Sequence, residues 1–151
     1  MKKFKSLCIA LAIVSGIQCS TAFAAGTTAS FDNGIAVTSV QPRGRYLQDG
    51  ECSITPYDGY VKVYGKTISY DPVDEITVEL ALYKEVSPGS WSCIWSDSKT
   101  AYNTSSVKYP TTTVYVERGY NFKVVSNHIV TENGTTESSP LETNKVYVAA
   151  N

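Results

Sequence analysis

The feature that most constrains the fold is a regular alternation of apolar and polar or small residues between Glu75 and Val86. This period of two is typical of a β-strand with one buried face and one face in solvent. The strand leads into Ser87-Pro88-Gly89-Ser90, in which Pro presets φ at one central position and Gly tolerates a positive φ at the next. Because the chain then returns through Trp91 to Trp95, the pattern predicts a β-hairpin. Period two also places Trp91, Cys93 and Trp95 on one face, which we expect to point toward the core.

The rest of the chain from Gly34 onward consists of short β-branched and aromatic segments, none with a sustained helical period. Asn133-Gly134 is the strongest hairpin signal. Residues 25–33 look like a loose N-terminal segment and Thr135 to Pro140 like a surface loop. We therefore predict an all-β fold, a single antiparallel β-sandwich of about seven to eight strands. Beside the hairpin, the expected strands are 35–40, 52–55, 60–64 with a continuation to 70, 111–117, 120–131 and 145–149.

The first 24 residues have the pattern of a cleavable signal peptide. Lys2, Lys3 and Lys5 precede a short apolar run from Leu7 to Ile17, and Ala22-Phe23-Ala24 forms a small-x-small cleavage site. The apolar run is too short to cross a bilayer, which needs about 20 residues. Lipidation at Cys19 is a weaker alternative, because Gln18 stands where a small residue is expected. We expect residues 25–151 to be secreted as one extracellular domain, with no membrane attachment after cleavage.

Loss of the leader leaves ten Lys and Arg residues against 14 Asp and Glu, a net charge near −4. This acidity argues against nucleic acid as a partner, and no motif calls for a cofactor. It also leaves two cysteines, Cys52 and Cys93. In an oxidising compartment, one disulfide between them is the simplest expectation.

No catalytic motif stands out. His128 is the only histidine, so a histidine-based zinc cage is excluded, and no nucleophile elbow accompanies it. Ser96 to Lys99 and Ser105 to Lys108 fit a serine-lysine pattern by chance. Paired carboxylates for glycoside cleavage, or oxygens around a calcium ion near Asp71 to Glu75, stay open as weaker alternatives. The acids considered are Asp71, Asp74, Glu75, Glu79 and Glu117.

Tyrosine offers the best candidate binding surface, because all 11 tyrosines follow the leader and a tyrosine ring can stay half exposed. One possible platform combines Tyr57, Tyr60 and Tyr64, and another combines Tyr102, Tyr109 and Tyr115. Arg43 and Arg45 flank a glycine and could grip a carboxylate or phosphate. Solvated strand surface and arginines paired with Asp49 or Glu51 are the structural alternatives.

Four segments resemble, in order and spacing, an uncharacterised family of small secreted Gram-positive bacterial proteins, a domain of unknown function. The segments are Pro42 to Leu47, Val73 to Ile76, Gly119 to Val124 and Asn133 to Ser138. The resemblance implies a β-sandwich behind a signal peptide, and it transfers no activity, cofactor or catalytic residue to this chain.

Together these observations favour a non-catalytic secreted module that binds an extracellular glycan or partner protein. Two alternatives remain: a small secreted hydrolase using paired carboxylates, and a secreted antagonist resembling a bacteriocin.

Overall fold

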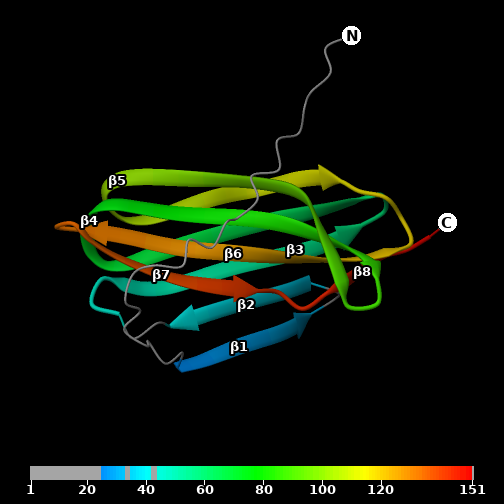
Figure 1. Ribbon diagram of the computed structural model, residues 1–151, viewed down its shortest axis with the longest axis horizontal. Helices are drawn as coiled ribbons and strands as arrows, with labels where there is room; N and C mark the ends of the chain where they lie inside the picture. The colour runs from blue at the N-terminus through cyan, green and yellow to red at the C-terminus, as the bar shows by residue number, and fades with distance from the viewer. Residues whose placement is uncertain (1–24, 33–34, 42–43, 151) are drawn as a thin grey trace, which may run out of the picture.

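The computed structural model describes residues 25–32, 35–41 and 44–150, so the expected signal peptide lies outside the described residues. The described chain is all β, as expected, and every strand pairing is antiparallel (Figure 1). No helix in this part has the length and hydropathy to cross a membrane. The strands are β1 (Ala25–Asp32), β2 (Ile35–Gln41), β3 (Leu47–Tyr57), β4 (Tyr60–Ser87), β5 (Ser90–Tyr115), β6 (Tyr120–Glu132), β7 (Thr135–Glu142) and β8 (Val146–Val148).

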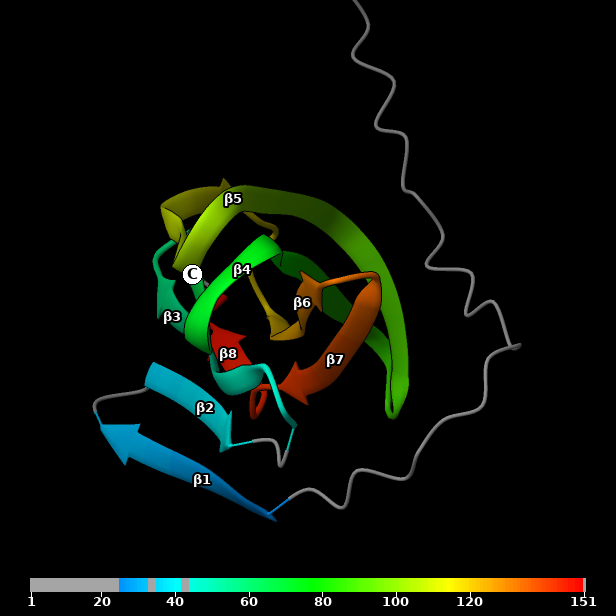
Figure 2. The same cartoon turned by 90° about the vertical axis from the view of Figure 1, so that its left-hand side faces the viewer.

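All eight strands belong to one sheet, in the order β1-β2-β3-β4-β6-β7, with β5 paired to β4 and β8 to β6. Viewed along the strands, this sheet curls over on itself (Figure 2). The expected sandwich of two separate sheets is therefore not confirmed. Two polar segments expected outside regular structure are strands: residues 25–32 form β1 along β2, and Thr135 to Pro140 lies in β7 along β6.

The curl comes from the hairpin of β4 and β5, whose strands have 28 and 26 residues. The first half of β4 pairs with β3, and the second half pairs with β6. The β4–β5 ladder is interrupted between Ile68 and Val73, and Asn103 on β5 has a positive φ of 52°. Both strands turn back there, so β3 and the first half of β4 face β6 and the second half of β4.

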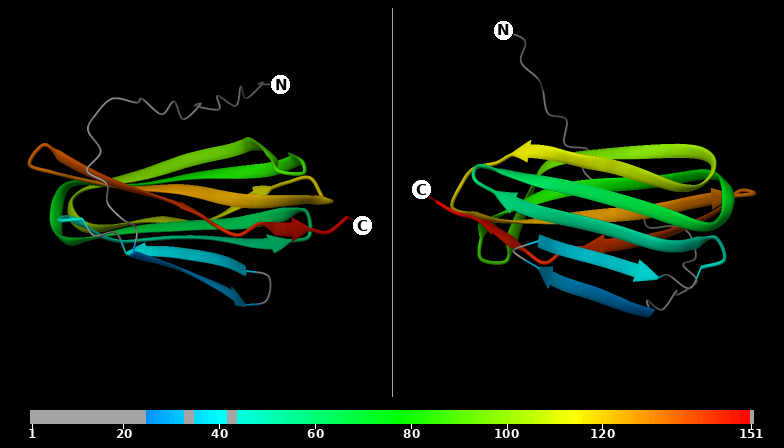
Figure 3. Two further views of the ribbon diagram at one scale, coloured as in Figure 1. Left: turned by 60° about the horizontal axis from the view of Figure 1, so that its bottom comes forward. Right: turned by 180° about the vertical axis from the view of Figure 1, so that it is seen from behind.

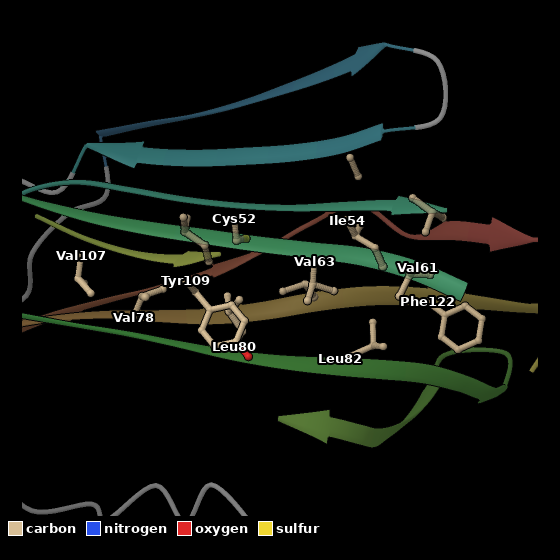
Figure 4. Packing of buried hydrophobic residues seen from close by; sticks show 14 of the residues in the cluster. Cys52, Ile54, Val61, Val63, Val78, Leu80, Leu82, Val107, Tyr109 and Phe122 are labelled. Carbon is tan, nitrogen blue, oxygen red and sulfur yellow. The ribbon is translucent and has the colours of Figure 1, made fainter. Parts of the chain in front are cut away.

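The core lies between these facing halves, and the predicted alternation builds it (Figure 4). Ile76, Val78, Leu80 and Leu82 on β4 are all at most 1% exposed. They meet inward residues of the first half of the sheet, including Ile54, Val61 and Val63. Alternate residues of the same strands are therefore left on the outer surface of the curled sheet.

The connections gather at two ends of the elongated molecule (Figure 3). At the first end lie the Asp58-Gly59 and Pro88-Gly89 turns and residues 116–119, which we call the turn end. At the other, the bend end, lie the β4–β5 bend, the Asn133-Gly134 turn and residues 44–46. Both residues of the Asn133-Gly134 turn have positive φ, 50° and 73°, as its sequence predicts.

Candidate functional site

The candidate site is a cluster of three tyrosines, Tyr57, Tyr60 and Tyr115, at the turn end. Tyr57 and Tyr60 pair across the β3–β4 hairpin, and Tyr115 of β5 pairs with Tyr60 from its other side. The Tyr57 and Tyr60 rings stack, with centroids 4.8 Å apart and an 8° angle between planes. The Tyr115 ring lies 6.0 Å from Tyr60 and is tilted by 59°. Two tyrosines of one tight hairpin and a third from a later strand thus form one aromatic surface.

Polar groups hold this cluster in place. Arg118 forms a salt bridge to Asp58 at 2.9 Å, and the amide of Val116 donates to the carbonyl of Gly59 at 3.1 Å. The Lys62 ammonium lies 5.0 Å from the Tyr57 ring centroid. Tyr115 is 83% exposed and Tyr57 40% exposed. A partner could therefore reach the cluster without any movement of the fold.

The two predicted tyrosine platforms fare differently. Tyr64 alternates with Tyr60 along β4, and Tyr57 pairs with Tyr60 across the hairpin, so the three residues of the first set lie on one face. The second set is not one surface. Tyr109 is buried, and its hydroxyl donates to Asp97 at 2.6 Å, while burial and that carboxylate raise its pKa to about 12. Tyr102 lies toward the bend end, opposite Glu75.

The arginine loop binds a carboxylate, but through its backbone. The amides of Arg45, Tyr46 and Leu47 donate to the two carboxylate oxygens of Glu137 at 2.8, 3.0 and 2.9 Å. Such a concave row of amides is a general anion site, here filled by the chain itself. The Arg45 guanidinium lies instead 5.3 Å from the Tyr46 ring centroid. Arg43 is outside the described residues.

A Cβ atom on Gly44 would overlap the Glu137 carboxylate, so this close approach requires glycine. The interaction joins two of the segments on which the family resemblance rests. A third segment joins them at the same end: Asp74 accepts from the Asn133 amide at 2.9 Å, and its own amide donates to Glu132 at 2.8 Å. Three of the four segments that carry the family resemblance are therefore held to one another at the bend end.

The remaining candidate acids are dispersed. Glu117 forms a salt bridge to Lys84 at 2.7 Å, and Glu79 accepts from Asn127 at 3.2 Å. A shallow pocket at the turn end has Glu85 as its one carboxylate, and that group already accepts from Gly89, Asn121 and Lys145. Within the described ranges, no three His, Cys, Asp or Glu residues gather as metal ligands would.

His128 is fully buried and held by two hydroxyl groups. The Thr67 hydroxyl donates to the Thr77 carbonyl at 3.0 Å, so it accepts from Nδ1 of His128 at 2.9 Å. Nε2 then accepts from the Ser126 hydroxyl at 2.9 Å. Burial lowers the imidazole pKa from 6.5 to about 4. This neutral ring is sealed in the core, where its two hydrogen bonds give it a structural role.

The two serine-lysine patterns lie in β5. Residues three positions apart in a strand point to opposite faces, so neither serine is aligned with its lysine.

The structure corrects the predicted disulfide between Cys52 and Cys93. Cys52 and Cys93 are both described, and no bond joins them. Cys52 points into the core, where burial raises its thiol pKa to about 11. Leu82 pairs with Trp95 but Tyr83 pairs with Cys93, so a bulge at Ile94 breaks the period of two. Cys93 therefore lies beside Tyr83 on the outer face, and the sequence signal for a shared inward row was misleading.

The fold and site thus define a single curled all-β domain with an exposed aromatic surface. The chain belongs to a family described as "Family of unknown function (DUF6147)", which matches residues 24–146. No curated protein matches it.

Proposed function

We propose that the chain is a secreted, non-catalytic binding domain of a Gram-positive bacterium, and that its contact surface is the tyrosine cluster. Its ligand is an extracellular glycan or a partner protein. Cleavage after Ala24 would release a protein that begins at Ala25.

The observation that carries this proposal is the exposed packing of Tyr57, Tyr60 and Tyr115. Aromatic side chains supply a large contact area at low entropic cost and dominate many binding hot spots. Here they are already ordered by stacking and by the Asp58–Arg118 ion pair. Binding would therefore require little rearrangement.

The test compares Tyr115→Ala and Tyr60→Ala with Tyr102→Ala. Tyr102 is a matched control, because it is 65% exposed and lies in the same strand as Tyr115, outside the cluster. Binding of fluorescently labelled protein to isolated Gram-positive cell envelopes is measured by sedimentation. We expect at least a tenfold loss for the cluster variants and none for the control. Equal binding by all three variants would refute the proposal.

The proposed secretion is tested by a separate measurement. Intact-mass analysis of the protein from culture medium should give a chain that begins at Ala25 without a lipid. A protein found only inside cells, or one that retains Cys19 with acyl chains, would contradict the secretion part of the proposal.

A further inference from the structure

The face that carries the tyrosine cluster also carries a row of lysines. Along the first half of β4, Tyr60, Lys62, Tyr64 and Lys66 occupy alternate positions and share the outer face. Lys108 of β5 pairs directly with Lys66 and extends the row sideways. We call these residues, with Tyr57 and Tyr115, the Tyr–Lys face.

Within the part of the chain that the structure describes, Lys62, Lys66 and Lys108 form no ion pair. Among the described residues, the four salt bridges involve Lys84, Arg118, Lys123 and Lys145. Glu51 of β3 is the cross-strand neighbour of Lys66 on β4, yet the two side chains form no salt bridge. Three cations on one face thus lack a carboxylate partner, although Lys62 also lies against the Tyr57 ring.

The Lys66–Lys108 pair is also unfavourable for the sheet. Like charges directly opposite on neighbouring strands repel each other. Glu51, opposite Lys66 on its other side, offsets part of this repulsion, but in the described part of the chain neither lysine forms an ion pair. A local conflict of this kind is typical of functional surfaces. A polyanion bound across both strands would remove it.

The opposite outer surface has the reverse charge. Glu75, Glu79 and Glu85 alternate along the second half of β4, with Lys123 of β6 beside them. A polyanion would therefore meet the Tyr–Lys face, although the chain after the leader is acidic overall.

The ring geometry limits the kind of polyanion. Tyr60 covers one face of the Tyr57 ring, so the Lys62 ammonium must cover the other. Tyr57 therefore has no ring face left on which a nucleobase could stack, and stacking on successive rings drives binding of single-stranded nucleic acid. The ring edge and hydroxyl group of Tyr57 remain, and these suit sugars or polyols; the exposed Tyr115 ring is the one on which a base could still stack, so poly(dT) is one of the comparison probes.

The charge spacing fits a polymer. Lys62 and Lys66 are four residues apart on β4, which is about 13 Å along a strand. Lysine presents a point charge and lacks the planar fork with which arginine grips a carboxylate. Arg118, the one arginine beside the cluster, is held by Asp58.

We propose that the Tyr–Lys face binds a polyol or sugar polymer linked by phosphodiesters, with the lysines on the phosphates and the tyrosines on the polyol units. This inference rests on the proposed function and specifies its ligand.

The probe is fluorescent poly(glycerol phosphate), compared with neutral dextran and with poly(dT). The test variant is Lys66→Gln/Lys108→Gln, and Lys99→Gln/Lys145→Gln is the control with the same change in net charge. By anisotropy, we expect the test variant to bind poly(glycerol phosphate) at least tenfold more weakly and the control to bind within twofold of the wild type.

Salt provides a second readout. Three phosphate contacts, each releasing about 0.7 counterion, give a slope of about −2 for log K against log salt, falling to about −0.7 in the test variant. We expect dextran and poly(dT) to bind at least tenfold more weakly than poly(glycerol phosphate).

Other outcomes would overturn this inference. Equal loss in the two double variants would show attraction by net charge alone, and tighter binding of poly(dT) would assign the face to nucleic acid. Tyr115-dependent binding of envelopes that is insensitive to Lys66 and Lys108 would leave the proposed function standing and reject the phosphodiester ligand. If Tyr115→Ala does not weaken envelope binding, the proposed function itself fails.

Discussion

Acid should destabilise the protein through His128. Its folded-state pKa is about 4 against 6.5 for the exposed group. Between these values the unfolded chain binds a proton that the folded chain does not. The contribution of His128 is therefore intact above pH 6.5 and is lost as the pH falls toward 4. From pH 7 to pH 4.5 the loss is about 2 kcal/mol, a large part of the stability of a small domain.

The two hydrogen bonds of His128 explain why the folded protein disfavours its charged form. Nε2 accepts from Ser126, so a proton on this nitrogen would remove the acceptor of the Ser126 hydroxyl and force that hydroxyl to turn away. No water reaches the fully buried ring to solvate its charge. Protonation of His128 therefore favours the unfolded state.

Two measurements test this. Since the chain has one histidine, the NMR titration of its imidazole Cε1 proton reports His128 directly. Urea unfolding at pH 7 and pH 4.5 gives the free energies of unfolding. His128→Gln is the reference, because it keeps polar atoms near both hydroxyls but does not titrate. The stability difference between wild type and variant should shrink by about 2 kcal/mol at the lower pH.

A midpoint near 6.5 in the folded protein would refute the reasoning. So would a difference between the two proteins that does not change with pH. If the variant does not fold, the imidazole titration of the wild type still decides the question.

Three further predictions concern stability and reactivity. Glu137→Ala removes the acceptor of three amides and should cost about 2 kcal/mol in urea unfolding. Glu142→Ala, which breaks the salt bridge between Lys123 and the exposed Glu142 carboxylate, should cost about 0.5 kcal/mol or less; equal costs would contradict the role of the amide row. Gly50→Ala places a Cβ atom 2.6 Å from the imidazole ring, so we expect a loss of about 2 kcal/mol, and an unchanged thermal midpoint would mean that the two halves of the sheet do not approach as described. Cys52, buried and with a pKa near 11, should resist maleimide at pH 8 in the native protein and react in urea; peptide mapping identifies the site, and rapid native labelling of Cys52 would disprove its burial.

Most of the strands could be predicted from the sequence. The alternation from Glu75 to Val86 and the Asn133-Gly134 turn act over neighbouring residues, and the structure confirms both. Two polar segments, residues 25–32 and Thr135 to Pro140, could not be recognised. Their strands exist because β2 and β6 offer ladder partners, and local side-chain pattern does not record that pairing.

For the candidate site, the sequence by itself determined that Tyr60, Lys62, Tyr64 and Lys66 share a face, because side-chain direction alternates strictly within an uninterrupted strand. It could not determine that Tyr115 joins them, since that contact depends on the register between β4 and β5. The bulge at Ile94 and the capture of Glu137 by the residue 45–47 amides are likewise decided by long-range pairing. Tertiary structure alone placed Cys93 on the outer face and curled the sheet, because register and bending are set by partners distant in the chain.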